Sequence, residues 1–83
     1  MALSQIEKKV LKKLMRHTYV GKRHTAKDNI PKGFPKDERG DVRKAIKSLV
    51  RNGYLIEYPT SYGIHVSIDP ARTDEIKEIL GIG

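Results

Sequence analysis

Apolar residues recur every three or four positions near the start of the chain, a pattern that predicts a helix from Ser4 to about His17. Ser4 and Glu7 have the spacing of a capping box, in which each side chain accepts a hydrogen bond from the other residue's backbone N–H. Basic residues occupy the opposite arc of this helix. The expected buried stripe consists of Leu3, Ile6, Val10 and Leu14, widened by Leu11 and Met15.

A second run with the same period predicts a helix over 36–52, or 35–52. Gly53 follows Asn52 directly and is the expected C-terminal stop. Gly40 lies in the first turns and weakens the helix there by about 1 kcal/mol relative to alanine, so a start nearer Asp41 is also expected. The expected buried residues are Val42, Ala45, Ile46, Leu49 and Val50.

Alternation of apolar and polar residues then replaces the helical period. It predicts two strands, 54–58 and 62–69, and the connection over 59–63 is short enough for a hairpin. A last short helix is expected to begin at Thr73, with Ile76, Ile79 and Leu80 inward, and to end at Gly81. The residues expected on the buried face of the second strand are Ile64, Val66 and Ile68.

The segment between the two long helices gives weaker signals. Thr25 and Asp28 have a capping spacing that predicts a short helix reaching Ile30, where Pro31 would stop it. A brief extended piece is expected over 19–23. A two-stranded hairpin is not stable alone, so it must pack on the helices, and we expect an α+β fold forming a single domain over 1–83.

The charge of the chain is unevenly distributed. Its 83 residues include 17 Lys+Arg and 10 Asp+Glu, a formal net charge of +7. Residues 1–53 hold 15 of the basic and 5 of the acidic residues, which leaves +10, whereas residues 54–83 hold 2 and 5, which leaves −3. Such a field attracts a polyanion. Nucleic acid is the first expectation, and an acidic membrane surface or an acidic protein comes after it.

The segment VRKAIKSLVRNGYLIEY, Val42 to Tyr58, resembles the recognition helix and first wing strand of the winged helix-turn-helix DNA-binding superfamily. The resemblance extends from Ser4 to Ile68. It implies a three-helix core, a two-stranded or three-stranded antiparallel wing and a short C-terminal helix. It also implies that the helix over 41–52 enters the major groove of double-stranded DNA, while the wing over 58–63 touches the flanking backbone. A KRHTAKDNIPKGFPKDERGD-like segment is similar to one in a small group of uncharacterised archaeal proteins, which implies no activity.

The helix over 41–52 has residues suited to that role. The stretch 42–52 contains no Asp or Glu, whereas ordinary solvated helix faces mix both charges. Arg43 near the helix start, together with Arg39, is expected to read base edges, because the planar guanidinium can pair with guanine. Phosphate anchoring is expected from Lys27, Lys44, Lys47 and Arg51. Neutralising about five phosphates predicts a slope of about −4.5 for log K against log salt.

Two further groups are candidates for phosphate contacts. Thr60, Ser61 and Tyr62 at the hairpin tip can donate hydrogen bonds to phosphate, although the same residues are equally typical of a turn. Thr25 and Lys27 lie at the expected start of the short helix, where exposed N–H groups favour anions.

Nothing in the sequence favours an enzyme. The chain has no cysteine, and its three histidines, His17, His24 and His65, have no spacing typical of a metal site. We therefore expect no catalytic residue, metal or cofactor.

The function expected is double-stranded DNA binding, as a small transcriptional regulator or chromatin-associated factor. RNA or ribosome binding, or a protein-interaction adaptor, remains open as an alternative. No apolar run approaches the roughly 18 residues of a membrane span, and the amphipathic N-terminal segment has no signal-peptide core. A cytoplasmic, nucleoid-associated protein without membrane contact is expected. The apolar stripe over 73–80 could also support a homodimer.

Overall fold

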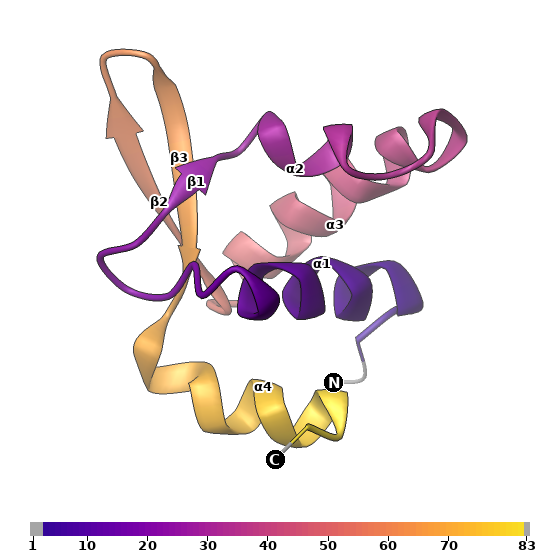
Figure 1. The fold of residues 1–83 in the computed structure, drawn as a ribbon, viewed down its shortest axis with the longest axis vertical. Helices are drawn as coiled ribbons and strands as arrows, with labels where there is room; N and C mark the ends of the chain where they lie inside the picture. Colours follow the sequence, from indigo (N-terminus) through magenta and orange to yellow (C-terminus); the bar gives the residue numbers. More distant parts are fainter. Residues whose placement is uncertain (1–2, 83) are drawn as a thin grey trace.

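Helices surround one face of a small sheet in the computed structural model, which describes residues 3–82 (Figure 1). Strand β3 lies between β1 and β2, and both neighbours are antiparallel to it. Two 3₁₀ turns, Lys36–Glu38 and Pro70–Arg72, precede the last two helices. The elements in chain order are α1 (Gln5–Arg16), β1 (Thr25–Ala26), α2 (Asn29–Lys32), α3 (Arg39–Arg51), β2 (Leu55–Thr60), β3 (Gly63–Ile68) and α4 (Thr73–Leu80).

The core lies where α1, α3 and α4 meet the inner face of the sheet. Both stripes predicted for the long helices point into it. Residues with no exposed surface come from every one of these elements. They include Val10 and Leu11 of α1, Val42, Ile46 and Leu49 of α3, Val66 and Ile68 of β3, and Ile76 of α4. Within residues 3–82, no helix is both long enough and apolar enough to cross a membrane.

The start of α1 confirms the predicted capping box. The Ser4 hydroxyl accepts a hydrogen bond from the Glu7 N–H at 3.1 Å, and the Glu7 carboxylate accepts one from the Ser4 N–H at 2.9 Å. This motif acts locally, so the sequence alone identifies it.

The segment between α1 and α3 differs from the expectation. Thr25 forms part of β1, opposite Val66 of β3, and does not begin a helix. The short helix α2 begins at Asn29 and includes Pro31, which the sequence predicts as its stop. Proline fits the first turn of a helix because the N–H it lacks would have no partner there. The extended piece predicted over 19–23 is a single parallel bridge between Val20 and Ile68.

The predicted start of α3 is also corrected. A 3₁₀ turn occupies Lys36–Glu38, and the α-helix begins at Arg39, so Gly40 is helical. At its other end, α3 stops before Gly53 as predicted.

The alternation predicted for β3 holds only near the core. Val66 and Ile68 are buried, but Ile64 is 44% exposed because the hairpin extends past the helices at that point (Figure 1). Ser67, predicted on the polar face, has no exposed surface. Its hydroxyl donates to the Gly21 carbonyl at 2.9 Å, so a loop covers the outer face of the sheet there.

Helix α4 packs on its own domain. Ile76 is fully buried, and Ile79 and Leu80 are partly buried against the same core. The side chain of Asp69 caps the 3₁₀ turn before this helix by accepting from the Ala71 N–H, so Thr73 is not the cap. The stripe predicted over 73–80 is therefore used within the chain.

Three helices end with the same left-handed turn. A residue with positive φ follows the C-cap of α1 and α3 and is itself the C-cap of α4, and the next N–H reaches back to a carbonyl five residues earlier, as in a Schellman motif. Gly53 (φ 83°) and Gly81 (φ 70°) occupy this position after α3 and α4. After α1 the residue is Thr18, with φ 55°. A β-branched residue is strained in this conformation, which costs about 1–2 kcal/mol.

Substitutions at these turns should have opposite effects. Thr18→Gly should raise the free energy of unfolding by about 0.5–1 kcal/mol, because relief of strain exceeds the added freedom of the unfolded chain. Gly53→Ala should lower it by about 1–2 kcal/mol, since the new Cβ would be strained and would lie 3.3 Å from the Arg72 Nη2. Urea unfolding measures both changes, and a loss of stability in Thr18→Gly would contradict the assignment of strain.

Candidate nucleic-acid interface

Helix α3 presents four cations to solvent, and its one acidic residue, Asp41, lies in the first turn. Its inward stripe is fixed by Val42, Ile46 and Leu49, none of which has any exposed surface. At about 100° per residue, the basic residues of the helix must then lie on the opposite side. The four exposed cations are Arg43, Lys44, Lys47 and Arg51, and we call this group the α3 basic face.

The α3 basic face has no internal counter-charge. Among residues 3–82, the ion pairs are Lys9 with Glu38, Lys27 with Glu57 and Arg72 with Glu75. None of them involves α3. Four cations on one face repel one another, so a bound anion would relieve that repulsion.

Arg39 has a different position from the other basic residues of the helix. Its Nε donates to the Phe34 carbonyl at 3.2 Å, and its Nη2 donates to the Lys32 carbonyl at 3.4 Å. The side chain is half-buried and holds the turn between α2 and α3. The structure therefore separates Arg39 from the four free cations with which the sequence groups it.

Thr25 does not lie at a helix N-terminus, because β1 replaces the predicted helix start, whereas Lys27 directly precedes Asp28, the N-cap of α2. Lys27 pairs with Glu57 of β2 at 3.4 Å, and its N–H donates to the Ile64 carbonyl. Both residues are half-buried, Thr25 in β1 and Lys27 in the turn after it. The helix start predicted at Thr25 is therefore corrected, and the phosphate contact of Lys27 stays a prediction.

The tip of the hairpin combines a closed turn with exposed side chains. The Thr60 hydroxyl donates to the Gly63 carbonyl at 2.6 Å and accepts from the Tyr62 N–H at 3.1 Å. Ser61 is exposed, and the Tyr62 side chain is 97% exposed. Thr60 thus shapes the turn, while Ser61 and Tyr62 face solvent beyond the body of the helices (Figure 1).

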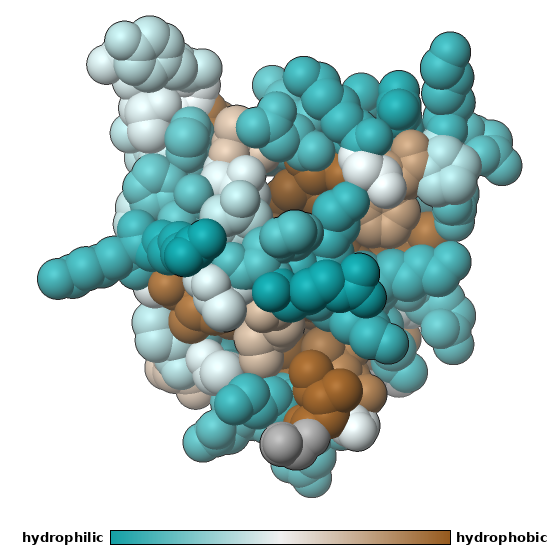
Figure 2. Space-filling view, in the orientation of Figure 1, coloured by the Kyte–Doolittle hydropathy of each residue, from teal (hydrophilic) through white to brown (hydrophobic). Residues whose placement is uncertain are grey.

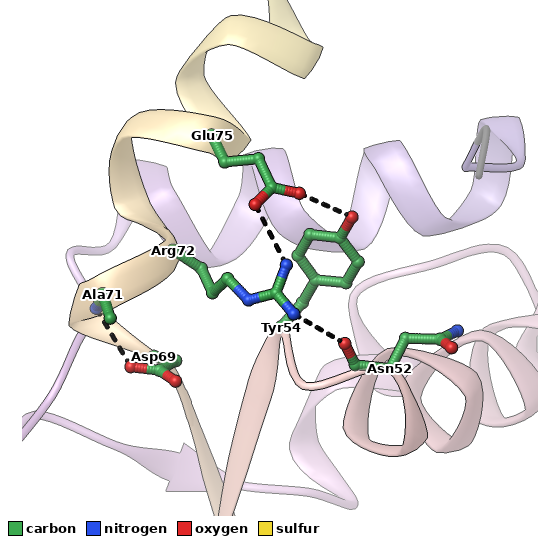
Figure 3. A network of polar contacts seen from close by, with 6 residues as sticks. All are labelled: Asn52, Tyr54, Asp69, Ala71, Arg72 and Glu75. Carbon is green, nitrogen blue, oxygen red and sulfur yellow. Dashed lines mark hydrogen bonds and ion pairs between the residues drawn. The ribbon is translucent and has the colours of Figure 1, made fainter.

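A polar network fixes the end of α3 to α4 (Figure 3). The Arg72 guanidinium donates to the Asn52 carbonyl at 3.2 Å and to the Glu75 carboxylate at 3.0 Å, and it lies 4.8 Å from the centre of the Tyr54 ring. The Tyr54 hydroxyl donates to the other Glu75 oxygen at 2.9 Å. Four residues from three segments thereby hold the junction between α3 and the hairpin.

The network shifts two titrations. The hydrogen bond from Tyr54, followed by that from Arg72, holds the pKa of Glu75 below its usual range. The hydrogen bond to Glu75, followed by burial, raises the pKa of Tyr54. Both shifts favour the ionised carboxylate beside a neutral phenol.

Two histidines meet on the outer face of the sheet, a contact that the sequence does not reveal. The Nδ1 atoms of His24 and His65 lie 2.9 Å apart, so one ring donates and the other accepts. The Tyr58 ring stacks on His24 with a centroid distance of 5.0 Å. Within residues 3–82, no group of three or more His, Cys, Asp or Glu side chains could hold a metal ion.

Gly40 lies on the exposed side of α3, three residues before Arg43 and four before Lys44. A Cβ placed there would meet no atom within 4 Å, so the fold itself does not require glycine at this position. A helix is less stable with glycine than with alanine, and the missing side chain leaves backbone exposed within the α3 basic face.

No protein-family model, curated protein or solved structure matches the chain. What the chain does must therefore be inferred from its own geometry and charge.

The network in Figure 3 should make stability depend on pH through Glu75. Because its folded-state pKa is below the unfolded value of about 4.3, its contribution is complete above that pH and is lost as the pH falls through the folded pKa. Glu75→Gln should therefore lower the free energy of unfolding at neutral pH, and its difference from the original protein should shrink below about pH 4. Urea unfolding at several pH values measures this difference.

The matched control is Glu78→Gln on the same helix, because the Glu78 side chain makes no hydrogen bond or ion pair within residues 3–82. It should change stability little at any pH. Equal behaviour of the two variants would contradict a role for Glu75 in the network.

Proposed function

We propose that this chain is a winged helix-turn-helix protein that binds double-stranded DNA. Helix α3 is the recognition helix in the major groove, and the β2–β3 hairpin is the wing on the flanking backbone. Such a protein acts as a small transcriptional regulator or a chromatin-associated factor. The observation that carries the proposal is the α3 basic face, four exposed cations without a carboxylate partner among residues 3–82.

The dimensions of α3 support this docking. Its 13 residues span about 20 Å, and a major groove about 12 Å wide admits one helix. Arg43 lies near the helix start, where a planar guanidinium can reach a guanine edge. Lys44, Lys47 and Arg51 then anchor phosphates along the helix.

The remaining predicted contacts divide into two groups. Ser61 and Tyr62 at the hairpin tip are free to donate hydrogen bonds to the backbone of the flanking DNA. Arg39, Lys27 and Thr60 make contacts within the chain. In this proposal Arg39 and Thr60 position the interface rather than touch DNA, and the phosphate contact of Lys27 stays a prediction.

Direct binding is tested by salt titration on random-sequence duplex DNA, with structured RNA as competitor. The three or four phosphates that the cations of the α3 basic face can neutralise give a slope of about −3 for log K against log salt. Preference for RNA would favour the ribosome-associated alternative. No binding to either nucleic acid at low salt would favour the adaptor.

Reversal of two charges on the α3 basic face should abolish this binding. Arg43→Glu with Lys47→Glu removes two cations and adds two anions near phosphate, so affinity should fall at least about a hundredfold in 0.1 M salt and the slope should flatten by about 2. Fluorescence anisotropy with a labelled duplex measures both quantities.

A matched variant separates contact from total charge. Lys22→Glu with Lys77→Glu makes the same change in net charge, from +7 by two reversals of two units each to +3, at exposed positions outside α3 and the hairpin. It should bind DNA much more tightly than the α3 variant. Equal losses in the two variants would mean that only net charge matters, and the recognition-helix assignment would be wrong.

A substitution at Gly40 should change the stability of the protein and its affinity for DNA in opposite directions. Gly40→Ala should raise the free energy of unfolding by about 0.5–1 kcal/mol, because the helical backbone prefers alanine and the space is empty. It should weaken DNA binding about threefold to tenfold if the DNA backbone approaches α3 at this point. Urea unfolding and anisotropy measure the two effects.

Thr18→Gly is the matched control for that experiment, since it should also raise stability but lies at the end of α1. Its DNA affinity should not change. Unchanged affinity in Gly40→Ala would contradict a close approach of DNA to the first turn of α3.

A further inference from the structure

Helix α1 presents a second basic surface. Val10, Leu11 and Leu14 turn one side of the helix into the core. The opposite side carries Lys9, Lys12, Lys13 and Arg16, and we call these residues the α1 basic face. In Figure 2, strongly hydrophilic side chains cover α1 on the side turned toward the viewer.

This surface is largely free of counter-charge as well. The exposed Lys9 pairs with the half-buried Glu38 at 3.6 Å. Within residues 3–82, Lys12, Lys13 and Arg16 pair with no carboxylate. A face that served only solubility would be expected to alternate basic with acidic residues, and this face does not.

The α1 basic face also surrounds a hollow. All four of its cations line a depression of about 350 Å³, whose far wall is formed by Gly33 and Phe34. The Lys13 ammonium lies 5.1 Å from the centre of the Phe34 ring. A Cβ at Gly33 would overlap the Lys13 ammonium, so glycine leaves the space in which that charge is held. Several cations are thus gathered around a concave site, which is suited to an anion with more than one phosphate.

The α1 and α3 basic faces cannot easily serve one duplex. Both helices bury the side that faces their common core, so their basic sides point away from it in different directions, and α1 lies below α3 in Figure 1. The molecule measures 34 × 30 × 22 Å, whereas at 0.15 M salt charges are screened within about 8 Å. Lys9 lies beside Glu38 at the start of α3, whereas Lys12 and Arg16 lie farther along α1, so we expect a duplex held by α3 to gain little from these two cations.

We propose that the α1 basic face binds the phosphate backbone of a second DNA duplex, so that one copy of the chain bridges two duplexes. The inference rests on the proposed function, because the first duplex is the one that α3 holds. The second contact is independent of sequence, since it consists of cations around a hollow and inserts no helix into a groove.

Bridging is measured by capture. One duplex is fixed to beads, a second labelled duplex is free in solution, and the protein is added at 0.1 M salt. The original protein should retain the labelled duplex on the beads. Lys12→Glu with Arg16→Glu should reduce that capture at least about tenfold, while its affinity for a single duplex in anisotropy should stay within about twofold.

The two control variants separate the sites. Lys22→Glu with Arg23→Glu, in the loop before β1, has the same net charge and should still bridge. Arg43→Glu with Lys47→Glu should lose both bridging and tight single-duplex binding. Circular dichroism confirms that each variant is folded, and Lys12→Gln with Arg16→Gln, which adds no negative charge, should show a smaller loss of capture.

Each other outcome overturns the proposal. If the original protein binds one duplex but captures no second duplex, the α1 basic face has no such role, and the proposed function still stands. If capture survives Lys12→Glu with Arg16→Glu, bridging arises elsewhere, and light scattering then tests for a dimer. If that variant loses single-duplex binding, the face belongs to the primary site. If the original protein binds no duplex at all, the proposed function fails first.

Discussion

The left-handed turn at Gly53 is the constraint on which the arrangement of α3 and the hairpin depends. It reverses the chain in one residue, so that the Tyr54 N–H bonds the Leu49 carbonyl of α3 at 3.0 Å and β2 begins immediately. Arg72 then closes the junction by donating to the Asn52 carbonyl, one of the helix-end groups that would otherwise lack a partner. A small domain without disulfides has few other ways to fix an angle between a helix and a hairpin. The orientation of the α3 basic face relative to the hairpin tip follows from this junction.

The acidic residues of the C-terminal part and the basic residues of α3 have different roles in the folded chain. The acidic residues of the C-terminal part stabilise structure: Glu75 completes the Arg72 network, and Glu57 pairs with Lys27 across the sheet. The cations in those two contacts, Arg72 and Lys27, hold elements of the fold together. The cations of α3 are left without such partners among residues 3–82, and their repulsion is a cost that the hydrophobic core must offset. Unpaired cations at the surface, beside paired charges elsewhere, are what we expect of a protein that binds a polyanion, as proposed.

The sequence predicts the features that depend on neighbouring residues, but it does not predict those that depend on residues far away in the chain. The capping box at Ser4, the apolar stripe of α3 and the stop at Gly53 each depend on residues within one or two turns, and all three are present. Ser67 can be buried because its hydroxyl donates a hydrogen bond to the Gly21 carbonyl, and the sequence pattern of β3 does not predict that partner. Ile64 is exposed because the helices end before the hairpin does. For the interface, the four cations of α3 follow from the helical period, whereas the engagement of Arg39 with two carbonyls depends on how the preceding turn folds.

Two positions violate the local rules that the rest of the chain obeys. Glycine occupies position 40, where the helix does not need it, and threonine occupies position 18, where the left-handed turn favours glycine. Sequences that are otherwise consistent with their fold tend to break such rules at sites selected for something else. Gly40 lies within the α3 basic face, where a side chain would stand between the helix backbone and a bound phosphate. Thr18 lies beside Met15 and Val20 in an open depression of about 430 Å³ at the end of α1, next to Arg16 of the second basic surface. Both residues are exposed, so the stability lost at both positions can be recovered without altering the core. The presence of glycine at position 40, despite this loss of stability, is explained if α3 is the surface that binds the nucleic acid.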